Sequence, residues 1–162
     1  MKSTRMTLIA TALGMALGPT LALASTETDI GFRGWGPRVG LSLNPDQVHF
    51  GAHLDFGQFA NHIRFQPNLE IGFGDDVKLF ALNAEASYRF SAQWNVWSPY
   101  LGGGVGANIK SVDDESQTDL GVNVLGGIEK GLANGDRFFI EGKFSLNDVP
   151  DAKITVGWTF YH

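Results

Sequence analysis

The feature that most constrains the fold is an unbroken alternation of apolar and polar residues in IRFQPNLEIGF, residues 63–73. One side of this stretch carries Ile63, Phe65, Pro67, Leu69, Ile71 and Phe73, and the other carries Arg64, Gln66, Asn68, Glu70 and Gly72. A period of two residues indicates a β-strand, because successive side chains of a strand point to opposite faces. The class of fold then depends on whether the apolar face points into a protein core or outward into lipid.

Alternation of this kind recurs along the chain, between separators rich in Gly, Asn, Asp and Pro, which tolerate turn geometry. The segments are 10 to 14 residues long, and they span residues 32–43, 47–57, 62–73, 77–90, 99–110, 119–131, 137–146 and 152–161. Globular strands usually have about 5 or 6 residues, whereas a tilted strand that crosses a bilayer needs about 9 to 11. We therefore expect an all-β, closed, eight-stranded antiparallel up-and-down barrel that spans a membrane.

The N-terminal residues are typical of an export signal. Lys2 and Arg5 precede the apolar run LIATALGMALG, and a small-residue ending, Ala22-Leu23-Ala24, comes before Ser25. We interpret residues 1–24 as a secretory signal peptide and residues 25–162 as one barrel domain. No later stretch approaches the roughly 20 apolar residues of a transmembrane helix.

Charge and cysteine content exclude several function classes. Removing Lys2 and Arg5 from the 12 basic residues leaves 10 against 17 acidic ones, a net charge of about −7 that argues against a nucleic-acid partner. The chain has no cysteine, so neither a disulfide framework nor a thiolate metal site is available.

The two faces of the eight segments differ in a way that answers the question of inside and outside. One face carries over thirty large apolar side chains, whereas the other combines glycine, small polar residues and charges of both signs. An eight-stranded barrel is only just wide enough inside for side chains to fill it, so the apolar set would overfill the interior. The apolar face is therefore expected to contact lipid.

All four tryptophans support the same orientation. If both ends of the chain lie at one rim, then Trp35, Trp94, Trp97 and Trp158 all map to that rim. Indole rings prefer the bilayer interface, so this grouping predicts an aromatic girdle. The acidic separators around residues 74–76, 111–118 and 147–151 map to the opposite, outer rim.

The mature chain resembles the small outer-membrane β-barrel proteins of the OmpA and OmpX type. The most specific element is the ending ITVGWTFYH, in which Ile154, Val156, Trp158 and Phe160 take the alternating apolar positions of the family's assembly signal. The family usually ends on Phe or Trp, whereas this chain ends on His162. The resemblance implies a location in the outer membrane of a Gram-negative bacterium. It also implies outer-membrane lipid, lipopolysaccharide and the barrel assembly machinery as partners.

Candidates for chemistry on the inner face are few. His49 and His53 share that face, but four residues along a strand separate them by about 13 Å, too far to chelate one ion. His53 and Asp55 are about 7 Å apart, and no nucleophile can be placed beside them. GGGVGA, residues 102–107, loosely fits a dinucleotide-binding pattern, but a strand rather than a helix follows it.

Enzymatic and metal-dependent functions are not indicated either. Lipid A deacylases of similar architecture carry a His-x-Ser pair on a lipid-facing strand, and the sequence has no such pair. Asp113, Asp114, Glu115 and Asp119 could bind a divalent cation, but the spacing of a calcium loop is missing. We predict no catalytic residue, no cofactor site and no metal site.

The inner charges are the residues expected to have a physical role. The basic set and the acidic set face each other across a narrow interior: Arg38, Arg64, Arg89, Arg137 and Lys143 against Asp55, Glu70, Glu85, Glu129 and Glu141. A buried charge without a partner would cost several kcal/mol, so we expect pairing that fills the barrel. The function predicted is a structural or surface-interaction role in the outer membrane. The alternatives are a secreted lipocalin-like ligand-binding barrel and a narrow ion-conducting pore.

Overall fold

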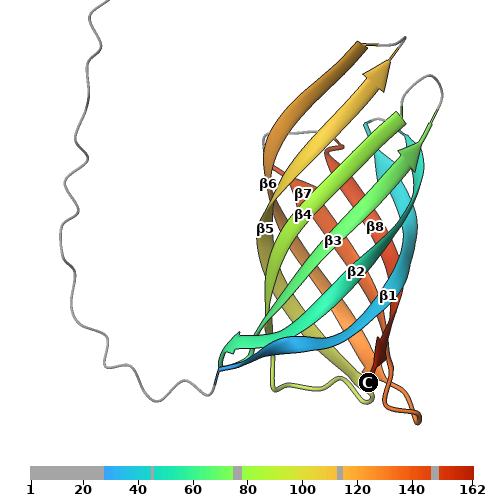
Figure 1. Cartoon of the computed structure of the whole chain (residues 1–162). Coiled ribbons are helices and arrows are strands. Elements are labelled where there is room, and N and C mark those ends of the chain that lie inside the picture. The colour runs from blue at the N-terminus through green and yellow to red at the C-terminus, as the bar shows by residue number, and fades with distance from the viewer. Residues whose placement is uncertain (1–27, 45, 75–77, 113–114, 147–149) are drawn as a thin grey trace, which may run out of the picture.

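The computed structural model describes residues 28–44, 46–74, 78–112, 115–146 and 150–162, and the segment interpreted as a signal peptide lies outside them. The described chain forms eight tilted antiparallel strands (Figure 1). They are β1 (Asp29–Leu43), β2 (Gln47–Ala60), β3 (Ile63–Phe73), β4 (Lys78–Arg89), β5 (Trp97–Val112), β6 (Glu115–Gly131), β7 (Arg137–Ser145) and β8 (Ala152–Tyr161).

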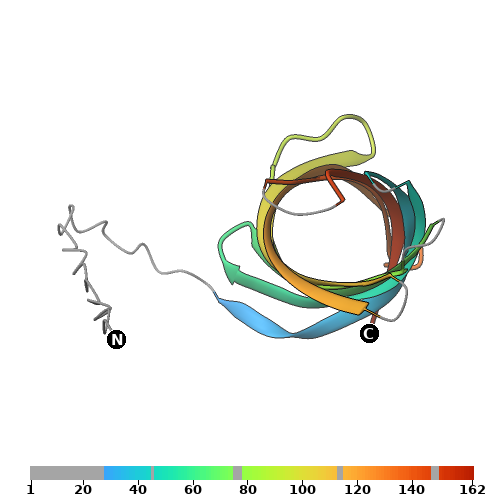
Figure 2. The ribbon, with the colours of Figure 1, turned by 90° about the horizontal axis from the view of Figure 1, so that it is seen from above.

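Each strand pairs with its neighbours in sequence, and β1 pairs with β8 to close the barrel. Figure 2 shows the closed ring seen along its axis. The closing register places Val39 opposite Val156 and Leu41 opposite Ile154. Closure leaves no free sheet edge, so the strand backbone satisfies its hydrogen bonds within the barrel. The predicted fold is confirmed.

The apolar face of the strands points outward. In β3, Leu69, Ile71 and Phe73 are exposed, whereas Glu70 and Gly72 between them are buried. The same alternation holds in β4, where Leu82 is exposed and Asn83 is buried. Large exposed apolar side chains cover the outside all round the barrel. This arrangement contradicts the lipocalin-like alternative, which needs the apolar face inside. No helix in the described residues is long and apolar enough to cross a bilayer.

Figure 1 shows the rim where β1 begins and β8 ends, here called the terminal rim. The positions of the tryptophans along the strands place all four toward this rim. Trp35 lies opposite Phe160, and their ring centroids are 5.7 Å apart. Phe138 contacts both Trp97, at 6.2 Å, and Trp158, at 5.5 Å. Trp94 lies in the β4–β5 connection, where its backbone forms an isolated antiparallel β-bridge with that of Trp97. The rings make edge-to-face or tilted contacts of the kind that aromatic pairs favour.

Two connections differ from their predictions. The second strand was expected to end at residue 57, but β2 continues to Ala60, which pairs with Ile63. Residues 111–118 were expected to link two strands, but the ladder of β5 and β6 continues to the pair of Val112 and Glu115. The hairpin therefore extends beyond the rest of the opposite rim (Figure 1). The residues of this extension are polar because the part of the hairpin outside the lipid-facing apolar band does not contact lipid. The two strands continue there through backbone pairing. The alternation of apolar and polar residues therefore ends before β5 and β6 do.

Candidate functional site: the charged lumen

The middle of the lumen holds a cluster of six ion-paired side chains, here called the central charge cluster. Arg38 lies at its centre, with nitrogens 2.6 Å from Glu141 Oε1, 3.2 Å from Glu70 Oε1 and 3.9 Å from Glu85 Oε2. The remaining ion pairs join lysine Nζ atoms to the same carboxylates: Lys143 to Glu85 and Glu70, and Lys153 to Glu70. All six side chains are at most 6% exposed.

Neutral groups complete this cluster. Asn68 donates to Glu85 Oε2 at 2.7 Å and accepts at 2.9 Å from Asn83. Tyr100 donates its hydroxyl to Glu141 Oε2 at 3.0 Å. Charges buried together are tolerated when their oxygens and N–H groups are hydrogen-bonded. Three cations and three carboxylates make the cluster electrically balanced.

A second group of charges, here called the arginine cluster, lies toward the terminal rim. Glu129 forms ion pairs with three arginines. Its Oε2 atom lies 2.7 Å from Arg64 Nη1, and its Oε1 atom lies 2.6 Å from Arg89 Nη2 and 3.4 Å from Arg137 Nη1. Asp55 lies 3.9 Å from Arg64 and accepts from the Tyr161 hydroxyl and the Gly57 amide, both at 2.8 Å. These five charged residues come from five different strands, so the cluster ties the wall together across the lumen.

Glycines on the inner face lie between the residues that pair. Gly51 of β2 is in register with Arg38 of β1 and with Glu70 of β3, which form an ion pair across it. Likewise Gly127 of β6 lies between Tyr100 and Glu141. A Cβ on Gly127 would meet Tyr100 Cζ and the hydroxyl oxygen at 2.6 Å. The missing side chain therefore lets residues two strands apart reach each other.

Both candidate histidines use the same arrangement. His49 Nε2 is 3.0 Å from Thr155 Oγ1, across Gly40 of β1. His53 Nε2 is 2.8 Å from Thr159 Oγ1, and its ring stacks edge-on against Phe139 at 5.3 Å. Each histidine is 2% exposed. The two imidazoles thus have separate hydroxyl partners.

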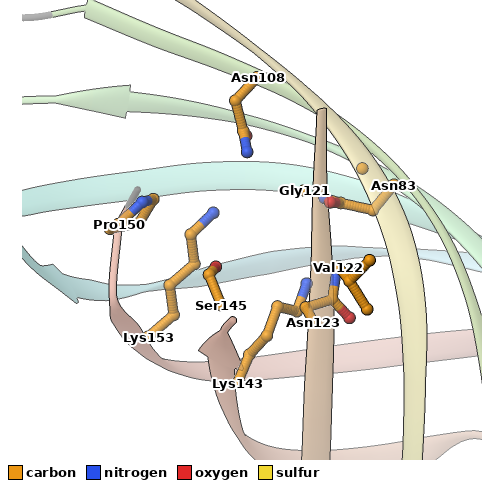
Figure 3. Close-up of a pocket in the computed structure, with 10 residues that line it drawn as sticks. Asn83, Asn108, Gly121, Val122, Asn123, Lys143, Ser145, Pro150 and Lys153 are labelled. Carbon is orange, nitrogen blue, oxygen red and sulfur yellow. The ribbon is translucent and has the colours of Figure 1, made fainter. Parts of the chain in front are cut away.

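A small polar cavity lies between the central charge cluster and the β7–β8 connection, with a volume of about 10 Å³. Figure 3 shows Asn108, Ser145 and Lys153 directed into this space, with Asn123 and Lys143 nearby. A cavity of this size holds about one water molecule. A larger cavity of about 200 Å³ opens beside the arginine cluster. The central charge cluster separates the two.

The other residues considered from the sequence are not brought together into a site. Among the described residues, no three His, Asp or Glu side chains are grouped to hold a metal ion. Asp113 and Asp114 lie outside the described residues, and Asp119 is near the β5–β6 end, where it accepts from Gln117 at 3.3 Å. Residues 102–107 belong to β5, so no helix follows these glycines.

Several lumen residues were absent from the sequence prediction. Lys153 completes the central charge cluster, and Tyr100, Leu125 and Phe139 form an apolar group inside the barrel. The alternation itself could have found them. Leu101 and Val124 face outward, so Tyr100 and Leu125 beside them must face inward.

Comparison with protein-family models and with curated protein sequences returned no match. Among solved structures, the chain is similar to Neisserial surface protein A, with a TM-score of 0.64, 21% identity and coverage of 82% of this chain and 97% of that chain. It is also similar to the N-terminal β-barrel domain of Pseudomonas aeruginosa OprF, with a TM-score of 0.63, 12% identity and coverage of 81% of this chain and 98% of that chain. The similarity to the outer membrane enzyme PagL has a TM-score of 0.51, with 14% identity and coverage of 80% of this chain and 99% of that chain.

These comparisons agree with the geometry of the chain. The apolar outside, the polar inside and the closed antiparallel ring define a transmembrane β-barrel. The chain has the fold of the small eight-stranded outer-membrane β-barrels. At these identities the likeness concerns the fold.

Proposed function

We propose that this chain is an exported protein of the Gram-negative outer membrane with a structural or surface-interaction role, and that its lumen neither conducts ions nor catalyses a reaction. The observation that carries the proposal is the central charge cluster, enclosed by a wall whose outside is apolar. The wall is suited to lipid, and the interior is occupied by side chains that hold one another in place.

The geometry of the lumen supports the absence of conduction. Barrels with aqueous channels need about 16 to 18 strands, whereas eight leave an interior just wide enough for side chains. Arg38 spans part of that interior, since it pairs with Glu70 of β3 on one side and Glu141 of β7 on the other. The cluster lies between the cavity of about 10 Å³ and the cavity of about 200 Å³. An ion would have to displace these pairs to pass.

The outer surface supports a non-enzymatic role. The fold alone does not decide this point, because the outer membrane enzyme PagL shares it. An enzyme acting on membrane lipid must present polar catalytic groups to the lipid. In β3 to β5 of this chain, the exposed mid-strand positions are apolar, such as Leu69, Leu82 and Val105.

The proposed partners follow from the surface and from the last strand. Outer-membrane lipid would contact the apolar band, and lipopolysaccharide would surround the β5–β6 hairpin. The barrel assembly machinery would bind β8, whose exposed or half-buried Ile154, Val156, Trp158 and Phe160 alternate with buried residues. No nucleic-acid partner is proposed, and the oligomeric state is left open.

Planar-bilayer recording on refolded protein, residues 25–162, tests the proposal. We expect no reproducible single-channel steps, because the central charge cluster blocks the lumen. Steady steps whose size changes in Glu85→Gln or Arg38→Gln would overturn the blocked lumen and favour the narrow pore. Lys78→Gln is the control for a change of charge outside the lumen, because Lys78 is exposed at the beginning of β4.

A further inference from the structure

The two charged groups in the lumen differ in their balance. The central charge cluster has as many cations as carboxylates. The arginine cluster sets Arg64, Arg89 and Arg137 against Glu129 and Asp55, which leaves one positive charge in excess among these five ion-paired residues. A buried excess charge is costly unless an ion compensates it.

The cavity of about 200 Å³ lies where this excess occurs, and it is here called the arginine cavity. Its wall includes Arg64, Arg89 and Arg137, together with Arg33, Tyr161 and the acidic residues Asp29 and Asp55. Arg33 forms an ion pair with Asp29 at the exposed rim, so this pair adds no net charge. A water molecule takes up about 30 Å³ in the liquid, so the space admits a small polyatomic anion.

The arginines retain donors for such a ligand. Each guanidinium carries five N–H groups, and the ion pairs to Glu129 engage one terminal nitrogen of each arginine. Among the described residues, the Nε atoms of Arg64 and Arg89 have no hydrogen-bond partner although both atoms are buried. Guanidinium groups match the oxygens of phosphate by paired N–H donors.

One further acidic group lies near the arginine cluster. Asp136, on the β6–β7 turn beside Arg137, accepts from Asn134 at 2.6 Å and from the Tyr161 amide at 3.3 Å, and it forms no ion pair with Arg64, Arg89 or Arg137, so it engages none of their donors. Both oxygens of Asp55 already accept from Tyr161 and Gly57. The guanidinium of Arg137 also stacks over the Tyr161 ring at 5.1 Å, which holds it at the cavity wall.

We propose that the arginine cavity binds a singly charged oxyanion of the phosphate type, either free phosphate or the phosphodiester of a lipid headgroup. The anion would neutralise the excess charge and accept from the arginines that converge on Glu129. The proposal does not rest on the absence of conduction or on the surface role of the barrel.

Isothermal titration of the refolded protein with inorganic phosphate, in a non-ionic detergent at constant ionic strength, tests the site. We expect saturable binding to the wild type and about tenfold weaker binding to Arg89→Gln and to Arg137→Gln, because each removes a charged donor. Both side chains are partly exposed, 23% and 27%, so both variants are expected to fold. Lys78→Gln, far from the cavity, should bind like the wild type.

Glu129→Gln provides a test with the opposite sign. It raises the excess charge of the arginine cluster, so the folded fraction should bind phosphate more tightly, an effect that a merely structural role would not produce. A second titration uses micelles containing a short-chain phosphatidylglycerol; binding only there identifies the headgroup as the source, and binding of free phosphate identifies the soluble ion. Absence of binding in both titrations, or undiminished binding by Arg89→Gln and Arg137→Gln, would overturn the site.

Discussion

At the scale of single residues, position in the wall decides what a charge does. Arg38 is buried among three carboxylates, whereas Arg33, five residues earlier in the same strand, is 44% exposed and has one partner at the rim. A screened rim pair contributes about 0 to 1 kcal/mol. Loss of one buried partner is far more costly, because it leaves uncompensated charge behind.

Replacing Arg38 by Met is expected to lower the free energy of unfolding by about 3 to 5 kcal/mol, since Glu70, Glu85 and Glu141 would then face only two lysines. Equilibrium unfolding by urea in lipid vesicles measures the loss. Lys78→Gln on the exposed end of β4 should change stability by less than about 0.5 kcal/mol. Equal losses in the two variants would show that the central charge cluster contributes nothing particular.

Replacing Val124 by Arg is expected to cost about 2 to 4 kcal/mol in a bilayer, because a charge would face the lipid near mid-strand. Val124 is 41% exposed and lies opposite Gly103 and Phe144. The chain has no cysteine, so one fluorescent probe can be attached at an introduced cysteine. Brominated lipids should quench a probe at residue 124 and spare one at Ala133 in the β6–β7 turn. A probe at 124 that escapes quenching would reverse the assignment of inside and outside.

At the scale of strands, glycines determine which strands can be linked across the lumen. A strand with a glycine at an inner position lets the side chains of its two neighbours meet over it, as Arg38 and Glu70 do over Gly51. A Cβ on Gly51 would approach Glu70 Cγ to 2.9 Å. The glycines thus create contacts between residues of strands that are not adjacent.

Replacing Gly127 by Ala is expected to destabilise the barrel by about 1 to 3 kcal/mol, because the new methyl group would displace Tyr100 and its hydrogen bond to Glu141. Gly126→Ala is the matched control. It lies one residue earlier in β6 and faces outward, and its Cβ would come no closer than 3.4 Å to Leu101. Unfolding by urea compares the two. A Gly126→Ala loss as large as that of Gly127→Ala would mean that backbone propensity, and not the lumen contact, is responsible.

At the scale of the whole molecule, closure of β1 on β8 is the decisive event. The pairing of Val39 with Val156 and of Arg38 with Gly157 removes both sheet edges at once. Every strand then has two partners. Because closure also assembles the arginine cluster and the central charge cluster, ring formation and charge pairing stabilise each other.

The folded protein is expected to resist SDS at room temperature and to change its mobility on a gel only after boiling, because a closed ring offers the detergent no unpaired edge. The measurement is electrophoresis of boiled and unboiled samples. A variant that lacks residues 152–162 leaves one edge of β1 and one edge of β7 unpaired, and it should migrate identically in both samples. Identical mobility of the complete barrel would contradict a stable closed ring.

The sequence by itself determined the number of strands, their approximate limits and the face that each side chain takes. These properties are local: a period of two residues places Leu69 and Glu70 on opposite faces whatever the neighbouring strands are. The number of strands also excluded an apolar interior, since eight strands enclose too little space for the large side chains.

Only the tertiary structure decided which charges pair and where charge is left in excess. Arg38 reaches Glu141, 103 residues away, because the ring closes with β8 between β1 and β7. Lys153 joins Glu70 across the lumen for the same reason. Such contacts depend on the register of every strand pair and on the closure of the ring, and no local pattern in a chain encodes the relative shift of strands that are far apart in sequence.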